Sequence, residues 1–386
     1  MKRPTRRIVC ATDFSENACL AADVAAAIAR RLRGTLVLVH VTDEAHVFGE
    51  STKDFRLAMQ RAKALLRQEA ERLRSGDLLL EEILLHGQSA ELAVGEMLAK
   101  NPPLLVVVSS VSKTAFDRWT LGSVSEHIAQ HAPVPTLVVR APGRLLGWTQ
   151  HVQTLKVVVA ADFTVSSDAA LAFVKVLRKI GACAVTVVHI NWPPNEVRWS
   201  PGSGLALTSN PPRVRRHLLR KLRNKIDEIV GGAIEMRLEP NWGRPDAAFV
   251  HLAAEAEADL IVVGAHQRHG MKRLTNVSIS RGVLRHAAMS VACVPVSVAL
   301  AHGVGRHPRV ERVLVASDLS ASGDQAVPWA YAAVAAGGTV QLLHVVEPWV
   351  PPNPLLAGYD PKRATKTAHL RCLADARKKL AALVPA

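Results

Sequence analysis

One phrase occurs three times in the sequence, and this repetition constrains the fold more than any other feature. Residues 7–15 read RIVCATDFS, residues 156–164 read KVVVAADFT, and residues 312–320 read RVLVASDLS. Each copy has a basic residue, an aliphatic run, a small residue, an aspartate, an apolar residue, and then Ser or Thr. The aliphatic run predicts a buried parallel strand. The Ser or Thr after it is a residue that caps helices, so a helix should follow.

The three copies continue in the same order. Alanine-rich segments predict helices over 18–32, 169–180 and 326–336, and the glycines that follow are typical helix stops: Gly34, Gly181, and the pair Gly337-Gly338. A second aliphatic run then ends in a histidine that lies 27, 27 and 26 residues after the aspartate, at His40, His189 and His344. A spacing kept this closely indicates one α/β unit written out repeatedly.

The first two copies go on to a third, fourth and fifth strand with helices between them, whereas the third copy reaches only strand, helix, strand and a helix around 366–383. Strands that alternate with helices predict parallel, doubly wound sheets. We therefore expect a first unit over 1–142, a second over 153–299 and a partial third over 309–386. Segments rich in Gly, Pro and His, at 141–153 and 302–309, are interpreted as linkers.

Composition narrows the class of protein. Hydrophobic residues make up 49% of the chain but aromatic residues only 4%, so the core should consist of Ala, Val and Leu. No apolar stretch predicts a membrane span, and the run 8–11 is too short for a signal-peptide core. The five cysteines are odd in number and have no CxxC spacing, which favours reduced, buried thiols in a cytoplasmic protein.

The formal net charge of +15 favours polyanionic partners such as nucleic acid, nucleotides or acidic membranes. The alternative is a solvated basic surface, which we prefer because no long basic run dominates. The second copy contains a basic amphipathic helix, with Leu218, Leu222 and Ile226 on one face and Arg213 and Arg220 on another. Nucleic acid is nevertheless not expected, because aromatic residues are scarce and no motif that reads DNA or RNA occurs.

These motifs resemble the universal stress protein family. The resemblance rests on the phrases ATDFS (11–15) and LVHV (38–41), on Gly243-Arg-Pro245, and on DLIVVG (259–264), and it covers nearly the whole chain. It implies five-stranded parallel sheets of Rossmann-like type, similar to the adenine nucleotide alpha hydrolase fold, in strand order 3-2-1-4-5. It also implies that the first two units pair through their fifth strands as an intrachain pseudo-dimer, with a truncated third unit added.

The resemblance also implies a nucleotide site at the carboxyl ends of the strands, where the strand order reverses. ATP-binding members of the family hold adenine and ribose near the first aspartate and the end of the second strand. They hold the phosphates in a glycine-rich loop after the fourth strand. In the first unit these positions are Ala11, Asp13, Val41, Ser109, Ser112, Gly122 and Ser123, so the second half of the loop motif, Gly122-Ser123, is intact.

In the second unit the corresponding positions are Asp162, Ile190, Gly264 and Ser278, while Gln267 and Val277 replace two glycines. A β-branched residue resists unusual backbone angles and crowds a phosphate. The first unit is therefore the better candidate for ATP or AMP, although cations such as His266 and Arg268 could bind phosphate instead. The third unit has Asp318 but no fourth strand.

Several of these residues have a structural interpretation as well. The three aspartates could contact a ligand or cap a helix, and the three strand-end histidines are more often structural than catalytic. His266, His269 and His286 do not fit a zinc spacing. No nucleophile elbow or Walker loop occurs, so no enzyme is expected.

The sequence therefore predicts a non-catalytic stress-response module that needs no cofactor. The alternatives are an electrostatic nucleic-acid binder and a nucleotide-hydrolysing or adenylating enzyme. The short third unit could pack on the others or form a homo-oligomer contact, and no membrane partner is expected.

Overall fold

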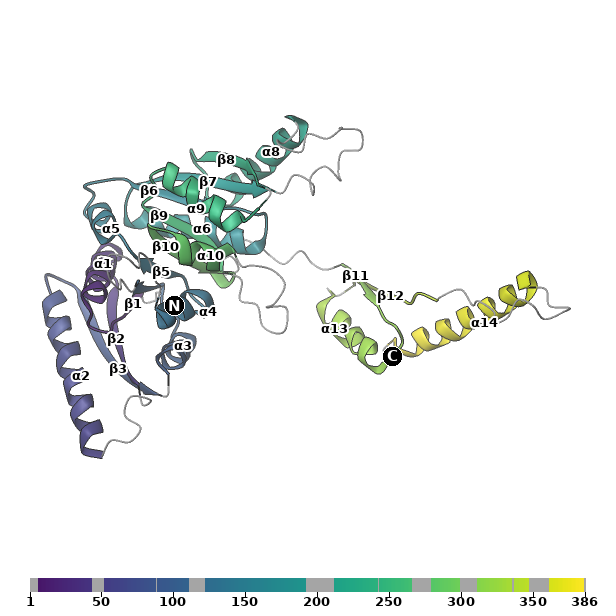
Figure 1. Cartoon of the computed structure of the whole chain (residues 1–386), viewed down its shortest axis with the longest axis horizontal. Helices are drawn as coiled ribbons and strands as arrows, with labels where there is room; N and C mark the ends of the chain where they lie inside the picture. The colour runs from purple at the N-terminus through teal and green to yellow at the C-terminus, as the bar shows by residue number, and fades with distance from the viewer. Residues whose placement is uncertain are drawn as a thin grey trace. The chain divides into compact units, whose positions relative to one another are not determined.

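A computed structural model of the chain describes residues 6–43, 52–87, 89–110, 122–191, 212–241, 243–265, 279–298, 311–334, 337–346 and 361–384. The chain divides into two compact bodies, Met1–Gly305 and Arg306–Ala386. The first body contains the first and second repeats, and the second body contains the third (Figure 1).

The first two repeats have the same order of elements. The first consists of β1 (Arg7–Ala11), α1 (Glu16–Leu32), β2 (Thr35–Asp43), α2 (Thr52–Leu73), β3 (Leu79–Gly87), α3 (Ala90–Lys100), β4 (Leu105–Ser109), α4 (Ser123–His131) and β5 (Thr136–Val139). The second consists of β6 (Leu155–Ala160), α6 (Val165–Ile180), β7 (Cys183–Asn191), α8 (Pro212–Ile229), β8 (Glu235–Pro240), α9 (Pro245–Glu255), β9 (Leu260–Ala265), α10 (Ile279–His286) and β10 (Ser290–Pro295).

All ten strands form one sheet, in the order β3-β2-β1-β4-β5-β10-β9-β6-β7-β8. Within each repeat the strands are parallel and follow the predicted order 3-2-1-4-5, which confirms the fold class. The repeats join where β5 and β10 pair antiparallel, with Val138 opposite Val291 and Thr136 opposite Cys293. This pairing confirms the intrachain pseudo-dimer through the fifth strands.

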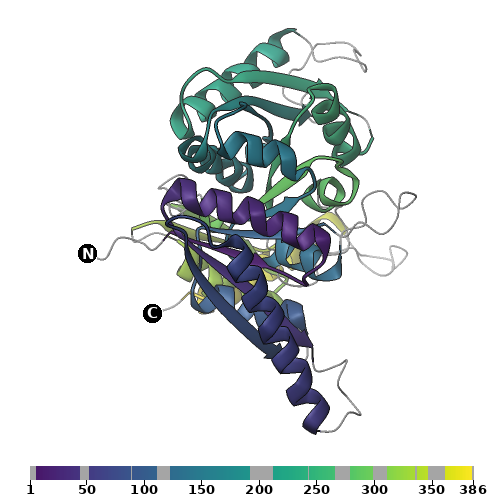
Figure 2. The same ribbon diagram turned by 90° about the vertical axis from the view of Figure 1, so that its left-hand side faces the viewer.

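Both faces of the sheet are covered, as the continuous aliphatic runs require. On β1, Ile8 and Cys10 belong to the apolar cluster beneath α1 and α2, whereas Val9 belongs to the cluster beneath α3 and α4. Figure 2 shows α1 and α2, in purple and dark blue, on the same face of the first repeat. Small side chains such as Ala21 and Ala25 are fully buried, so α1 can approach the strands closely.

The segment 141–153 is more than the linker that its Gly and Pro content predicted. It contains helix α5 (Pro142–Thr149), in which Pro142 occupies the first turn, where proline is tolerated. Leu145 and Trp148 lie three residues apart on one face and are buried in the same core as α1. The connection is thus part of the packed core between the repeats.

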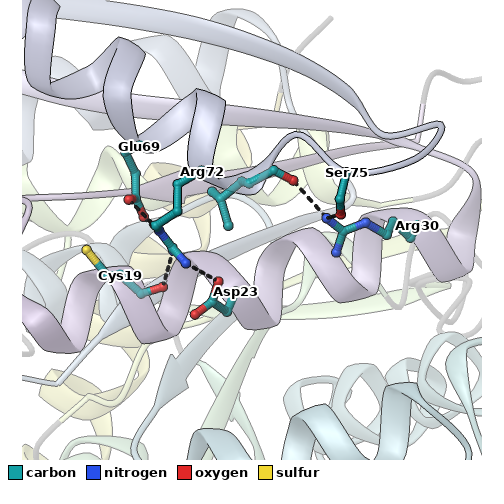
Figure 3. A network of polar contacts seen from close by, with 7 residues as sticks. Cys19, Asp23, Arg30, Glu69, Arg72 and Ser75 are labelled. Carbon is teal, nitrogen blue, oxygen red and sulfur yellow. Dashed lines mark hydrogen bonds and ion pairs between the residues drawn. The ribbon is translucent and has the colours of Figure 1, made fainter.

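Helix α2 is fixed to α1 by an arginine (Figure 3). The Arg72 guanidinium forms ion pairs of 2.8 Å with Glu69 on its own helix and with Asp23 on α1, and it donates a hydrogen bond to the carbonyl of Cys19. Nearby, Arg30 of α1 donates hydrogen bonds to the Leu73 carbonyl and the Ser75 hydroxyl at the end of α2. Glu69 is only 6% exposed, so Arg72 supplies the counter-charge that its burial requires.

The second repeat makes a similar helix contact at other positions. When the buried positions of the helices are matched, Lys225 on α8 takes the place of Glu69, and Asp168 on α6 takes the place of Cys19. Lys225 and Asp168 form an ion pair of 2.8 Å. In both repeats the ion pair between the two helices thus has its acid on the first helix and its base on the second.

The third repeat forms a two-stranded parallel sheet of β11 (Arg312–Ala316) and β12 (Thr339–Leu343) with helices α12 (Ala321–Asp324), α13 (Ala326–Ala333) and α14 (Pro361–Ala382). Its core centres on Val315, Val327 and Ala330. The helix predicted over 326–336 is preceded by the short α12 and ends earlier. Pro328 has no N–H to bond the carbonyl of Asp324, so the helix restarts at Ala326.

All five cysteines are free thiols, but only Cys10 and Cys293 are fully buried. Cys19 and Cys183 are half-buried and Cys372 is exposed, so the expectation of five buried thiols is wrong for these three. None of the helices in the described part of the chain has the length and apolar character needed to cross a lipid bilayer.

Candidate nucleotide site

The first aspartate of each repeat lies in a tight turn at the carboxyl end of the first strand. In the first repeat the Asp13 Oδ1 atom accepts hydrogen bonds from the Ser15 amide at 3.0 Å and from the Ser15 hydroxyl at 2.6 Å. Asp162 holds Thr164 and Asp318 holds Ser320 through the same two bonds. The same hydrogen-bonded turn is therefore present in all three repeats.

The residue that caps the following helix is the Ser or Thr and not the aspartate. The Ser15 hydroxyl accepts the Ala18 amide, the Thr164 hydroxyl accepts the Ser167 amide, and the Ser320 hydroxyl accepts the Gly323 amide. The hypothesis that the aspartates themselves cap the helices is corrected: each orients the capping side chain. In the third repeat the Ser320 hydroxyl lowers the pKa of Asp318, as expected for a carboxylate that accepts a charge-assisted hydrogen bond.

The apolar residue inside each turn has a strained backbone. Phe14, Phe163 and Leu319 have φ values of 63°, 61° and 61°, in the left-handed region that bulky residues avoid. In the first repeat the Phe14 amide donates to the Thr12 hydroxyl, and the Phe14 ring packs against His40 with centroids 4.4 Å apart. These contacts hold the turn in a conformation that costs of the order of 1–3 kcal/mol.

The strand-end histidines connect the first and second strands. The Nδ1 atom of His40 lies 2.8 Å from the Thr12 carbonyl oxygen, that of His189 lies 2.6 Å from the Ala161 carbonyl, and that of His344 lies 2.8 Å from the Ser317 carbonyl. A carbonyl oxygen can only accept, so we assign the Nδ1 proton to each ring. The interpretation of these histidines as structural is supported in every repeat.

The phosphate-loop residues of the first repeat meet at the carboxyl end of β4. Ser109 ends β4, and its carbonyl accepts a 2.8 Å hydrogen bond from the Ser125 hydroxyl in the first turn of α4. Gly122 is the N-cap of α4 and Ser123 is its first residue, and within the described residues no side chain caps this terminus. The structure thus brings Ser109, Gly122 and Ser123 together, whereas Ser112 lies outside the described residues.

The other predicted residues of this site lie beside the same edge of the sheet. Ala11 at the end of β1 and Val41 near the end of β2 both pack against the apolar cluster beneath α3 and α4. In the second repeat Ile190 packs in the corresponding place. Asp13 lies in the turn after β1, where its carboxylate accepts a hydrogen bond from Ser15, the N-cap of α1.

A carboxylate that the motifs did not predict lies beside this terminus. The hydroxyl of Ser89, the N-cap of α3, lies 2.6 Å from the Glu91 carboxylate and lowers its pKa, and His127 and Ser123 of α4 contribute in the same direction. Glu91 thus places negative charge beside the N-terminus of α4. An acidic residue in the first turn of the helix that follows His86-Gly87 is the sequence signal that could have identified Glu91.

In the second repeat the glycine that matches the loop motif, Gly264, allows close packing against a helix. A Cβ atom on Gly264 would lie 2.2 Å from the backbone oxygen of Ser166 in the first turn of α6. Only glycine therefore fits where β9 passes α6. Ser278, Gln267 and Val277 lie outside the described residues, as do His266, Arg268 and His269.

The helices that follow the fourth strands also form the contact between the two repeats. Glu126 of α4 accepts ion pairs from Arg281 and Arg285 of α10, each at 3.0 Å. Burial alone would raise the pKa of Glu126, but the hydrogen bonds and charges of the two arginines outweigh burial and lower it. Arg140, at the end of β5, donates to the Leu284 carbonyl of α10, and its burial lowers its pKa to about 10.

Within the described residues, no three His, Cys, Asp or Glu side chains gather closely enough to hold a metal ion. The groups near the carboxyl edge of the first repeat instead include hydroxyls, backbone amides and one carboxylate. Hydroxyls and backbone amides at a helix N-terminus can bind an oxyanion.

The fold defines a class of protein: tandem doubly wound α/β units that share one sheet. The sequence profile of the universal stress protein family matches residues 4–140, 154–295 and 309–385. The chain belongs to the universal stress protein family, and the three matches coincide with the three repeats. A search of the curated proteins gave no significant match.

Among similar solved structures, the first of the following shows the same fold. A universal stress protein from Archaeoglobus fulgidus is 18% identical, with a TM-score of 0.54 over 75% of this chain and 96% of that chain. A putative universal stress protein from Pseudomonas aeruginosa is 14% identical, with a TM-score of 0.48 over 78% of this chain and 97% of the other. A universal stress protein described in complex with cAMP is 22% identical, with a TM-score of 0.29 over 36% of this chain and 98% of the other.

Proposed function

We propose that this protein is a non-catalytic cytoplasmic stress-response module whose first repeat binds an adenine nucleotide, ATP or AMP, at the carboxyl edge between β1 and β4. The observation that carries the proposal is the hydrogen bond from Ser125 to the Ser109 carbonyl. It holds the N-terminus of α4 against the end of β4, at the point where the strand order reverses.

The N-terminus of α4 supplies what a phosphate needs. Its N-cap, Gly122, has no side chain, so the first backbone N–H groups of the helix can approach an oxygen atom closely. The helix dipole adds a favourable interaction with negative charge. Glu91 opposes this attraction, since its carboxylate interacts with Ser123. We therefore expect weak binding that Mg²⁺ strengthens by screening the two negative groups.

The first repeat is favoured over the second because of the residues in its loop. It keeps Gly122-Ser123, whereas Val277 takes the place of Gly122 in the second repeat. A β-branched residue in that place would crowd a phosphate.

The non-catalytic part of the proposal rests on how the reactive side chains are used. The Asp13 Oδ1 atom holds Ser15, and the His40 Nδ1 atom holds the Thr12 carbonyl. Both groups thus stabilise the end of β1. A general base must take up and release a proton, whereas these two atoms are engaged in structural hydrogen bonds.

Calorimetric titration of Mg-ATP and of AMP into the full chain tests the proposal, with cAMP as a further ligand. Gly122→Val is the variant to compare, because the φ of −63° at Gly122 is one that valine adopts, so only the space near the phosphate changes. We expect binding by the wild type and at least about tenfold weaker binding by the variant. Absence of heat with the wild type at high concentration would overturn nucleotide binding, and release of ADP above background would overturn the non-catalytic assignment.

A further inference from the structure

Helix α8 carries cations on its exposed side through its first three turns. Five residues of this half are exposed cations, Arg213, Arg215, Arg216, Arg220 and Lys221, and His217 is exposed among them. The acidic residues of the helix, Asp227 and Glu228, come only in its last turn. We call the face formed by Arg213, Arg216, His217, Arg220 and Lys221 the basic face of α8. Figure 1 shows this helix beside β7 and β8, at the end of the ten-stranded sheet.

This distribution of charge works against the stability of the helix. Cations in the first turn are unfavourable to the helix dipole, which prefers acidic residues there, and α8 has none in its first turn. Arg216 and Arg220 are four residues apart, a spacing at which like charges repel. Among the described residues neither makes an ion pair. The basic face therefore costs stability, and within the described residues no ion pair of Arg216 or Arg220 offsets this cost.

The fold does not require these cations, because α2 occupies the corresponding place in the first repeat without them. The buried residues of the two helices match with a constant offset, Ala62 with Leu218, Leu66 with Leu222, Ala70 with Ile226 and Leu73 with Ile229. With that offset the basic face of α8 corresponds to Leu57, Gln60, Arg61, Ala64 and Leu65 on α2. The same exposed face thus has one cation in the first repeat and four, with a histidine, in the second.

The apolar side of α8 is not available to a partner. Leu218, Leu222, Ile226 and Ile229 are all at most 3% exposed and pack into the core. A helix that binds a lipid surface inserts its apolar face between the headgroups, and α8 has already buried that face. A partner must therefore be recognised by charge, from the solvent side.

We propose that the basic face of α8 binds the phosphodiester backbone of nucleic acid without reading its sequence. The face extends from Arg213 to Lys221, a rise of about 12 Å, which is the axial length of about three to four base pairs. The scarcity of aromatic residues argues against base stacking but not against backbone contacts, because these need only cations. The Nζ atom of Lys221 lies 4.1 Å above the Phe163 ring, which positions one end of the face.

Fluorescence anisotropy with a labelled 20-base-pair DNA duplex of arbitrary sequence tests this proposal, with the full chain, over a series of salt concentrations. The variant R213Q/R216Q/R220Q removes three charges from the basic face and leaves Lys221 in place. The matched control, R56Q/R61Q/R67Q, removes three exposed charges from α2 and therefore has the same net charge. Glutamine is a good helix former, so both should fold, and thermal melting of each variant checks this.

We expect the α8 variant to bind at least tenfold more weakly and to reduce the slope of log K against log salt by about 2–3, since each lost phosphate contact reduces it by about 1. The α2 variant should bind within about twofold of the wild type, because distant charges are screened. Equal binding by the α8 variant and the wild type would overturn the proposal. So would an equal loss in the α2 variant, or binding by the wild type only to vesicles of phosphatidylcholine and phosphatidylserine.

Discussion

The imidazole of His40, in β2, donates a hydrogen bond to the carbonyl of Thr12, so the residue that follows β1 is tied to β2 by a side chain as well as by the sheet. We expect His40→Ala to lower the free energy of unfolding by about 1–2 kcal/mol, because the buried carbonyl loses its partner and Phe14 loses a packing surface. Urea unfolding measures the change. His86→Ala is the control, since His86 ends β3 and is exposed; equal effects of the two substitutions would contradict a structural role of His40.

Gly264→Ala should destabilise the first body by about 1–3 kcal/mol, because the added Cβ atom would meet the Ser166 backbone oxygen at 2.2 Å. Gly95→Ala is the matched control. Gly95 lies inside α3, and a Cβ atom there meets nothing within 4 Å, so the control should be stabilising by about 0.5–1 kcal/mol. Differential scanning calorimetry compares them, and an increase in Tm for Gly264→Ala would show that the close approach is not real.

Glu126→Gln should weaken the contact between the repeats in a pH-dependent way. The arginines hold the pKa of Glu126 below its usual range, so its contribution is present above the unfolded-state pKa of about 4.3 and is lost as pH falls through the lower folded-state value. At pH 7 the substitution should cost about 1 kcal/mol, and the two proteins should converge as the pH falls through the folded-state value. Unfolding free energies measured from pH 3 to pH 8 give this difference, and a difference independent of pH would exclude an ionic role.

Arg72→Met should destabilise the α1–α2 contact by about 1–3 kcal/mol, because Glu69 then keeps a buried charge without its partner. Adding Glu69→Gln removes that charge, so the double variant should recover part of the loss. A double-mutant cycle by urea unfolding gives the coupling energy between the two residues. Simple additivity of the two substitutions would mean that the ion pair does not contribute.

The cysteines should differ in reactivity toward a maleimide at pH 7. Burial, and then the Glu69 carboxylate, raises the pKa of Cys10, and burial raises the pKa of Cys293 to about 12 and that of Cys183 to about 11. Since the thiolate is the reactive form, these three should be labelled only after unfolding. Cys372 is exposed on α14 and should be labelled in the folded chain. Peptide mapping by mass spectrometry identifies the labelled residues, and rapid labelling of Cys293 would contradict its burial.

The repeat phrase predicted the sheet because each part of it is determined locally. An aliphatic run buried on both faces must be a central strand, and Ser15, Thr164 and Ser320 cap helices through bonds to residues three positions later. Helix ends were less predictable. Arg33, with φ of 50°, takes the left-handed position after α1. The next residue is Gly34, because a side chain there would meet the Arg6 carbonyl.

The candidate site was only partly predictable, because its decisive contacts join residues distant in sequence. The Gly-rich motif identified Gly122 and Ser123, but the effect of Glu91 depends on α3 lying beside α4. Likewise, Gly264 matches the motif in sequence, yet its neighbour Ser166 lies 98 residues earlier. Glu126 and its arginines are separated by more than 150 residues, and no spacing rule relates them.

The ion pairs Arg72–Asp23 and Lys225–Asp168 bear on how a chain of near-copies folds correctly. Tandem copies of one fold are prone to exchange equivalent elements while folding. Asp23 corresponds to Ala172 on α6, and Asp168 corresponds to Cys19 on α1. An exchange of α2 and α8 would therefore lose both ion pairs, so the two contacts favour the helix that belongs to the same repeat.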